Sequence, residues 1–259
     1  DASHIDLSLS LCEWAKVHDS KASMKLSIGL FLNNNIPAFI AVENGKENDM
    51  VQGRKFQFPA GSIVVFDKGY VDYQWYANLT AQNIGFVTRF RPKSVYQVIQ
   101  QHPVLESKGI LKDETIQLNS AHALKKKAPA LRRIEYRDRQ SGKHFSFLSN
   151  NFHLAASTIA AIYKDRWKVE LFFKAIKQNL KLKAFLGRSR NAIQTQIWIA
   201  MIAYLLLSFA QHLGKTGWTV QRLLRIIQVN LFERRTLKAL FSPDKIPIKQ
   251  EEAHVSFLL

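Results

Sequence analysis

The sequence has few of the features that mark secreted or membrane proteins. Its 259 residues include a single cysteine, Cys12, so no disulfide can form within the chain, which suits a reducing compartment. The longest apolar run, residues 197–207, has 11 residues. A bilayer-spanning helix needs about 20, so we expect a buried core helix there. Residues 1–20 lack the basic segment followed by an apolar run that marks a signal peptide.

Two common signatures of catalytic or metal sites are also missing. No Gly-rich phosphate-binding loop of the GxxxxGK type occurs. The eight histidines show none of the paired spacing typical of zinc ligands, so we interpret them as ordinary surface or core residues. The sequence contains no internal repeat and no low-complexity tract. It therefore predicts a globular protein without a nucleotide-binding loop or a zinc site.

Acidic side chains are scarce relative to basic ones, and they are unevenly placed. The chain has 20 Asp and Glu against 37 Lys and Arg, a net charge of +17. Such a charge favours nucleic acid as a partner, with an anionic membrane second. Residues 85–190 carry a net charge of +15, whereas residues 1–84 carry −2. An acidic region in a basic protein is typical of a protein site that binds a divalent cation next to the phosphate backbone of a nucleic acid. An acidic surface exposed to solvent gives the same pattern.

The pattern of apolar residues predicts strands first and helices later. Strands are expected at residues 1–9, 24–32, 36–42, 62–66 and 86–90. The three asparagines at 33–35 predict a hairpin turn, because Asn tolerates positive φ. The fully apolar run 62–66 predicts a buried strand. A helix is expected at 72–79, short β-like pieces within 91–150, and helices from 155 onward. This order predicts an α/β fold with a mixed sheet.

The helix that begins near residue 157 has a distinctive polar face. At about 100° per residue, four polar side chains share an arc of about 60°; they are Tyr163, Arg166, Glu170 and Lys177. Glu170 is the only acidic member, and Lys174 adds another positive charge. One interpretation is a solvated face with an Arg166–Glu170 ion pair at spacing i, i+4. The other is a site that faces phosphate.

Three carboxylates from separate segments favour the second interpretation. Asp1 lies in the first predicted strand, Asp67 directly follows the strand at 62–66, and Glu170 lies on the later helix. Ends of sheet strands are where open α/β folds place their sites. Three carboxylates can bind two hard cations about 3.5–4 Å apart, the arrangement used for in-line phosphoryl displacement. Mg²⁺ is the expected ion, since it prefers oxygen ligands.

Several other residues have two interpretations. Asp49 is expected in a loop and Asp72 at a helix N-terminus as a cap, and either is a possible substitute ligand. Trp167 either packs in the core or stacks on a DNA end. The lysines at 125–127 form a solvated loop or contact the DNA backbone.

The motifs together resemble the insertion-sequence-four family of bacterial DDE transposases. Its YREK signature is Tyr-x2-Arg-x3-Glu-x6-Lys, which here corresponds to Tyr163, Arg166, Glu170 and Lys177. Asp67-Lys-Gly-Tyr is similar to the second-aspartate motif of that family, and Asp1-Ala-Ser to the first. The similarity extends from residue 1 to about residue 241.

The resemblance implies a ribonuclease H-like core, a mixed sheet flanked by helices, with a β-rich insertion before the helix that carries Glu170. The expected domain limits are 1–90 for the first part of the core, 91–150 for the insertion, 151–241 for the helical second part of the core, and 242–259 for a C-terminal tail.

The resemblance also implies an activity: Mg²⁺-dependent cleavage at transposon ends, with Mn²⁺ as a substitute, then attack of the freed 3′-hydroxyl on target DNA. The metal ligands would be Asp1, Asp67 and Glu170. Contacts to DNA would come from Tyr163, Arg166, Trp167, Lys174 and Lys177. The implied partners are transposon-end and target DNA and a second copy of the chain when bound to DNA, without a membrane. The implied location is the bacterial cytoplasm, in association with the nucleoid.

Two departures from the family leave alternatives open. The N-terminal DNA-end-binding segment of the family does not precede Asp1, so we expect a catalytic-core fragment. No tryptophan lies within 85–150, so a hairpin step in cleavage is left unassigned. One alternative is a truncated, non-catalytic DNA-binding remnant, which predicts salt-sensitive binding without metal-dependent nicking. Another is a structure-specific nuclease on the same fold.

Overall fold

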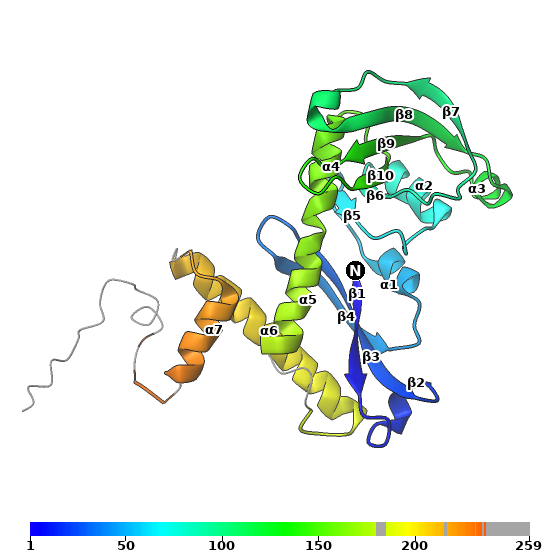
Figure 1. The fold of residues 1–259 in the computed structure, drawn as a ribbon. Helices are drawn as coiled ribbons and strands as arrows, with labels where there is room; N and C mark the ends of the chain where they lie inside the picture. The colour runs from blue at the N-terminus through cyan, green and yellow to red at the C-terminus, as the bar shows by residue number, and fades with distance from the viewer. Residues whose placement is uncertain (180–184, 215–216, 231, 235, 237–259) are drawn as a thin grey trace, which may run out of the picture.

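The computed structural model describes residues 1–179, 185–214, 217–230, 232–234 and 236. Within these residues the chain forms two β-sheets with helices packed beside them (Figure 1). The predicted α/β class with a mixed sheet flanked by helices is confirmed. The predicted domain limits remain predictions.

The first sheet is antiparallel and is built around one long strand. Its members are β1 (Ala2–Leu7), β2 (Lys16–His18), β3 (Lys21–Phe31) and β4 (Ile36–Asn44). The central strand β3 pairs with β1, β2 and β4. Asn35, in the turn between β3 and β4, has a φ of 57°. The predicted Asn hairpin is therefore confirmed.

The second sheet is mixed and has six strands, in the order β5-β6-β10-β9-β8-β7. They are β5 (Ile63–Val65), β6 (Gly85–Arg89), β7 (Tyr96–Gln101), β8 (Ile110–Leu118), β9 (Leu131–Arg137) and β10 (His144–Ser149). Only β5 and β6 run parallel, and the other pairings in this sheet are antiparallel. Strands β7 to β10, which all lie within residues 91–150, thus continue the sheet that β5 and β6 begin, through the pairing of β6 with β10.

The helices expected at 72–79 and from 155 onward are present, while two short helices, at residues 49–55 and 121–125, were not predicted. The helices are α1 (Asp49–Lys55), α2 (Tyr73–Ala81), α3 (Ala121–Lys125), α4 (Ala156–Asp165), α5 (Trp167–Asn179), α6 (Arg190–Gly214) and α7 (Val220–Val229), with short 3₁₀ turns at η1 (Glu13–Ala15) and η2 (Glu106–Lys108). The helix predicted to run on from residue 157 is divided into α4 and α5 at Arg166. The amide of Arg166 donates to the Tyr163 carbonyl at 3.1 Å, and the Val169 amide donates to the Arg166 carbonyl at 3.0 Å. Both bonds span three residues, which gives a tight turn between the two helices.

Helices α4 and α5 pack on different sheets. Ile159 and Tyr163 of α4 share a buried cluster with Phe147 of the second sheet. Val169 and Phe172 of α5 belong to the cluster formed by the first sheet and α6. The α4–α5 junction therefore lies where the two sheets approach each other (Figure 1).

Two predictions about burial are wrong. The apolar run 62–66 predicts a buried strand, but β5 is only partly covered and Ile63 is 38% exposed. The apolar run 197–207 was expected to be a buried core helix. It lies in α6, which buries one face through Met201 and Tyr204 but leaves Ile199 and Leu206 on the other face exposed. A run of apolar residues in the sequence does not indicate how many faces of the resulting helix or strand are covered by other elements.

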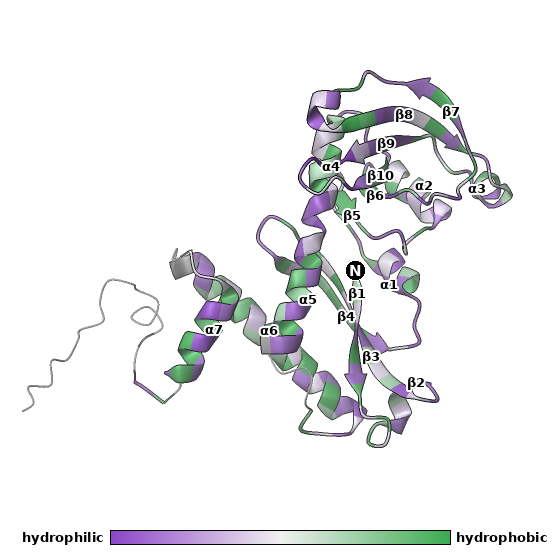
Figure 2. Ribbon diagram, in the orientation of Figure 1, coloured by the Kyte–Doolittle hydropathy of each residue, from purple (hydrophilic) through white to green (hydrophobic). Residues whose placement is uncertain are grey.

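The apolar character of α6 also bears on the membrane question. By length and composition, one segment of the described part of the chain, Arg190–His212, is apolar enough to cross a membrane, and 39% of its apolar window is buried. The next helix, α7, is amphipathic, with hydrophobic and hydrophilic bands alternating along it (Figure 2). It buries Leu223 against Leu207 of α6.

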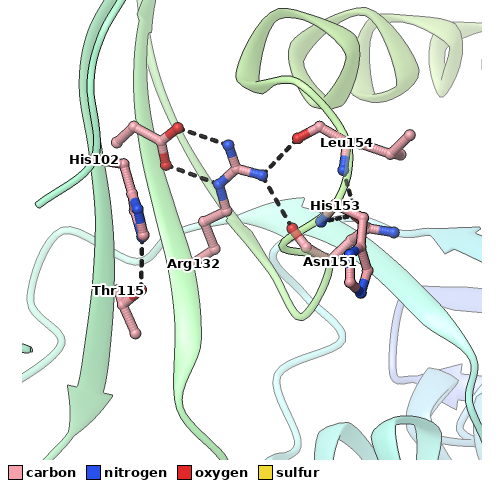
Figure 3. Close-up of polar contacts among 7 residues, drawn as sticks. His102, Thr115, Arg132, Asn151, His153 and Leu154 are labelled. Carbon is pink, nitrogen blue, oxygen red and sulfur yellow. Dashed lines mark hydrogen bonds and ion pairs between the residues drawn. The ribbon is translucent and has the colours of Figure 1, made fainter. Parts of the chain in front are cut away.

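The loop before α4 is held by one arginine of the second sheet. Arg132 of β9 donates Nε and Nη2 to the two carboxylate oxygens of Asp113 on β8, at 2.8 and 2.6 Å. Its Nη1 donates to the carbonyls of Asn151 and Leu154, at 3.3 and 2.6 Å (Figure 3). The Asn151 side-chain oxygen in turn accepts from the amides of His153 and Leu154. These bonds fix the point at which α4 begins.

Asp72 caps α2, as predicted. Its Oδ1 accepts a hydrogen bond of 2.9 Å from the Trp75 amide. We expect Asp72→Ala to lower the free energy of unfolding by about 1 kcal/mol, a decrease in Tm of roughly 2–4 °C for a chain of this size. Differential scanning calorimetry measures it.

Asp72→Asn is the matched control for the cap. Asparagine keeps the side-chain acceptor but loses the ion pair with Arg54. The Arg54 side chain is 57% exposed and the Asp72 side chain 11% exposed, so solvent around Arg54 screens the pair and keeps its contribution below that of the cap. An equal loss of stability in both variants would assign the effect to the ion pair and contradict the capping role.

Candidate active site

Asp1 is held at the start of the first sheet by backbone hydrogen bonds. The Ile28 amide donates to the Asp1 carbonyl at 2.8 Å, and the α-amino group of Asp1 donates to the Ile28 carbonyl at 2.9 Å. These bonds continue the ladder between β1 and β3. The Asp1 carboxylate is therefore placed by the sheet rather than by a free chain end.

Arg166 joins Asp1 to Glu170. Its Nη1 donates to Asp1 Oδ2 at 3.0 Å and its Nη2 donates to Glu170 Oε1 at 2.6 Å. The Asp1, Arg166 and Glu170 side chains are 22%, 16% and 39% exposed. The ion pair predicted within the helix is therefore present, and it is shared with the first strand. Solvent can reach the group, but each charge is partly screened from water.

Nearby carboxylates stabilise the positive charge of Arg166. Burial lowers the pKa of the Arg166 guanidinium, but the hydrogen bond to Glu170 and the charges of Glu170 and Asp67 outweigh it, so the net shift is upward. The guanidinium also lies 5.8 Å from the centre of the Tyr163 ring. Burial raises the pKa of that tyrosine, so Tyr163 is present as the neutral phenol at neutral pH.

Asp67 lies near this group but does not join it. It follows β5 and Phe66, and its Oδ1 accepts a hydrogen bond of 2.6 Å from the Lys68 amide. Its negative charge acts on Tyr163 and Arg166. No group of three or more His, Cys, Asp or Glu side chains able to hold a metal ion occurs among the residues that the structure describes. The structure thus brings Asp1 and Glu170 together and leaves Asp67 beside them.

The donor atoms nevertheless suit a hard divalent cation. Carboxylate oxygens are the ligands that Mg²⁺ prefers. A positive group, the guanidinium of Arg166, already lies between Asp1 and Glu170, so this position favours positive charge. The residues present therefore have the right ligand atoms for a cation. Their arrangement places the Arg166 guanidinium where a cation would lie.

The residues predicted to contact DNA differ in exposure. Tyr163 is buried and packs on Phe147, with ring centroids 5.0 Å apart. Trp167 is 58% exposed, so core packing is not its arrangement. Lys174 is exposed and Lys177 is half-buried, both on α5. The structure therefore leaves Trp167 and Lys174 accessible and turns the Tyr163 ring inward.

The prediction that Asp49 lies in a loop is wrong. Asp49 is the first residue of α1, directly after Asn48, whose side chain caps the helix. Its carboxylate pairs with the buried Lys25 of β3 at 2.6 Å. The sequence does carry a signal for this helix: the N-cap residue Asn48 is followed by the apolar residues Met50 and Val51, a pattern that marks the start of a helix.

A cavity of about 720 Å³ lies beside the candidate site. Asp1, Asp49 and Arg166 line it together with apolar residues of β3 and β5, such as Leu30 and Val65. The carboxylates and the guanidinium therefore lie at the edge of a mostly apolar opening between the two sheets, where the low local dielectric strengthens electrostatic interactions.

Comparison with known proteins identifies the family. Residues 10–206 match the family described as "Transposase DDE domain". The chain is 33% identical to y4zB of Sinorhizobium fredii, a protein named as a candidate transposase, over 91% of this chain and 67% of that protein. It is 28% identical to a protein of Geobacillus stearothermophilus named as the probable transposase of insertion sequence element IS5377, over 80% of this chain and 54% of that protein.

A third relative agrees with these two. It is a protein of Synechocystis named as a candidate transposase of insertion sequence element IS4SA, 26% identical over 82% of this chain and 60% of that protein. The chain thus spans between about half and two thirds of the length of these relatives. Because the family match covers most of the sequence, the chain belongs to the DDE transposase family.

Proposed function

We propose that this chain forms the catalytic core of an insertion-sequence-four transposase, which cleaves DNA at the ends of its element and joins the freed 3′ end to target DNA. The proposal rests on one observation: Asp1 of the first strand and Glu170 of α5 meet at Arg166 in a chain that belongs to the DDE transposase family. We assign Asp1, Asp67 and Glu170 as the ligands of Mg²⁺, with Mn²⁺ as a substitute.

Members of this family generally use divalent metal ions. When bound, such ions lower the pKa of the attacking water or hydroxyl and stabilise the leaving oxygen. The residues of the chain hold the DNA in place. Arg166 offers a planar fork that matches a phosphate, while Lys174 and Lys177 supply point charges. The exposed Trp167 ring provides a surface on which a terminal base stacks.

The charge of the chain supports DNA as the partner. Residues 85–190 carry a net charge of +15, and each phosphate neutralised by Lys or Arg releases counterions. We propose that two copies of the chain bind two transposon ends as a homodimer, in the bacterial cytoplasm near the nucleoid.

Incubation with supercoiled plasmid tests the activity. With Mn²⁺ or Mg²⁺ we expect nicked circles, and with EDTA none. DNA binding should fall with salt, with log affinity decreasing linearly in log salt concentration. The assay needs no knowledge of the transposon-end sequence.

Other outcomes favour the alternatives. Salt-sensitive binding without nicking at any metal concentration would contradict the catalytic proposal and indicate a DNA-binding remnant. Metal-dependent nicking without joining of 3′ ends to a second DNA, when a pre-cleaved element end is supplied, would indicate a nuclease on the same fold.

A further inference from the structure

Arg166 lies in the position that the proposed function gives to a cation. Each of its two Nη atoms donates to a different carboxylate, one from β1 and one from α5. With Asp1 and Glu170 ionised, the three side chains carry one net negative charge. A divalent cation in place of the guanidinium would neutralise the two carboxylates, and each carboxylate would keep a positive partner.

The two roles proposed for Arg166 exclude each other. A guanidinium whose Nη atoms face Asp1 and Glu170 cannot present the same fork to a DNA phosphate. The guanidinium holds one oxygen of each carboxylate and lies between the two groups, where a cation bound to both carboxylates would lie. A cation that enters the group must therefore displace Arg166, and a phosphate that attracts Arg166 must free the carboxylates.

The local structure allows such a displacement. Arg166 lies at the turn between α4 and α5, and its side chain is 16% exposed. Its Nε is buried and makes no hydrogen bond in the described structure. The guanidinium is thus held through its Nη atoms to two partly exposed carboxylates. Its Nε is a donor that a phosphate contact would satisfy.

We propose that Arg166 is a reversible stand-in for the divalent cation. Without DNA it holds Asp1 and Glu170 and opposes metal binding. When DNA binds, Arg166 moves to a phosphate, and the carboxylates become available to the metal. The proposal rests on the proposed function for its DNA and metal ligands. Thermodynamic linkage then requires that DNA raises metal affinity and that metal raises DNA affinity by the same factor.

Metal binding measured without cleavage tests this device. Mn²⁺ affinity is determined by electron paramagnetic resonance, with and without a short DNA duplex. For the parent protein we expect DNA to raise Mn²⁺ affinity by about tenfold, within the range common for coupled sites. For Arg166→Gln we expect high affinity already without DNA and little further gain on adding it.

Lys164→Gln is the matched control, because Lys164 is exposed on the neighbouring turn of α4 and carries the same charge. It should keep the parent's response to DNA, since any general effect of removing a positive charge is present in both variants. If Arg166 is only a fixed brace between β1 and α5, Arg166→Gln will lower Mn²⁺ affinity or leave it unchanged, which overturns the proposal.

The parent protein alone also decides the matter if Arg166→Gln does not fold. Equal Mn²⁺ affinity with and without DNA contradicts the stand-in role. Failure of the proposed function looks different: Mn²⁺ affinity responds to DNA as described, but supercoiled plasmid is not nicked. The stand-in role of Arg166 would then hold in a protein that does not cleave DNA.

Discussion

Glu170→Gln is expected to reduce metal-dependent nicking of supercoiled plasmid by about 100-fold or more. Glutamine keeps the shape of the side chain but removes the charge, and Glu170 is one of the two carboxylates that meet at Arg166. Metal ions contribute several kcal/mol of charge stabilisation to such reactions, and 1.36 kcal/mol corresponds to a tenfold change in rate. The initial rate of nicked-circle formation in Mn²⁺ measures the effect.

The fold and the affinity for DNA should change little in this variant. Glu170 is 39% exposed, so loss of its pair with Arg166 costs little stability, and removal of a negative charge does not weaken binding to phosphate. Glu106→Gln changes the net charge equally at an exposed site on η2 and serves as the control. Nicking by Glu170→Gln at the parent rate would place the catalytic group elsewhere.

The local parts of this site were predictable from the sequence. The spacing of Arg166 and Glu170 indicates an i, i+4 pair, which the structure contains at 2.6 Å. The cap at Asp72 and the Asn hairpin also depend on neighbouring residues only. By contrast, the contact of Arg166 with Asp1 needs α5 to pack on the first sheet, and no spacing within the helix reveals that.

The break at Arg166 shows where a periodic pattern fails. Ile162 of α4 and Val169 of α5 are seven residues apart, which keeps helical spacing across the junction, and no Gly or Pro marks it. The two helices divide because Tyr163 packs on Phe147 of the second sheet while Phe172 packs on Tyr204 of α6. Helical periodicity indicates that one face of a helix is buried but not which element covers that face. A helix whose first half packs on one sheet and whose second half packs on another therefore has the same pattern as a continuous helix. The placement of the three carboxylates at strand ends and on the later helix and the resemblance to a known family both indicated Asp1, Asp67 and Glu170; neither indicated that Asp1 and Glu170 meet at an arginine.

Arg132→Met is expected to lower the free energy of unfolding by about 3–5 kcal/mol. The Arg132 and Asp113 side chains are 9% and 4% exposed. Removal of one partner leaves a buried charge without compensation, which is the costly case. The change also removes the donor to the carbonyls of Asn151 and Leu154. At roughly 2–4 °C per kcal/mol for a chain of this size, Tm should fall by roughly 6–20 °C in a calorimetric scan.

The double variant Arg132→Met with Asp113→Leu separates the charge from the loop. It removes both members of the Arg132–Asp113 ion pair, so neither buried charge is left without its partner, and it should be more stable than Arg132→Met alone. The carbonyls of Asn151 and Leu154 still lack their donor, so the loop before α4 should exchange its amide hydrogens faster in both variants. Equal stability of the single and double variants would show that the cost lies in the loop rather than in the unpaired carboxylate. Since this loop fixes where α4 begins, and α4 leads directly to Arg166, faster exchange there together with an altered Mn²⁺ affinity would connect the second sheet to the candidate active site.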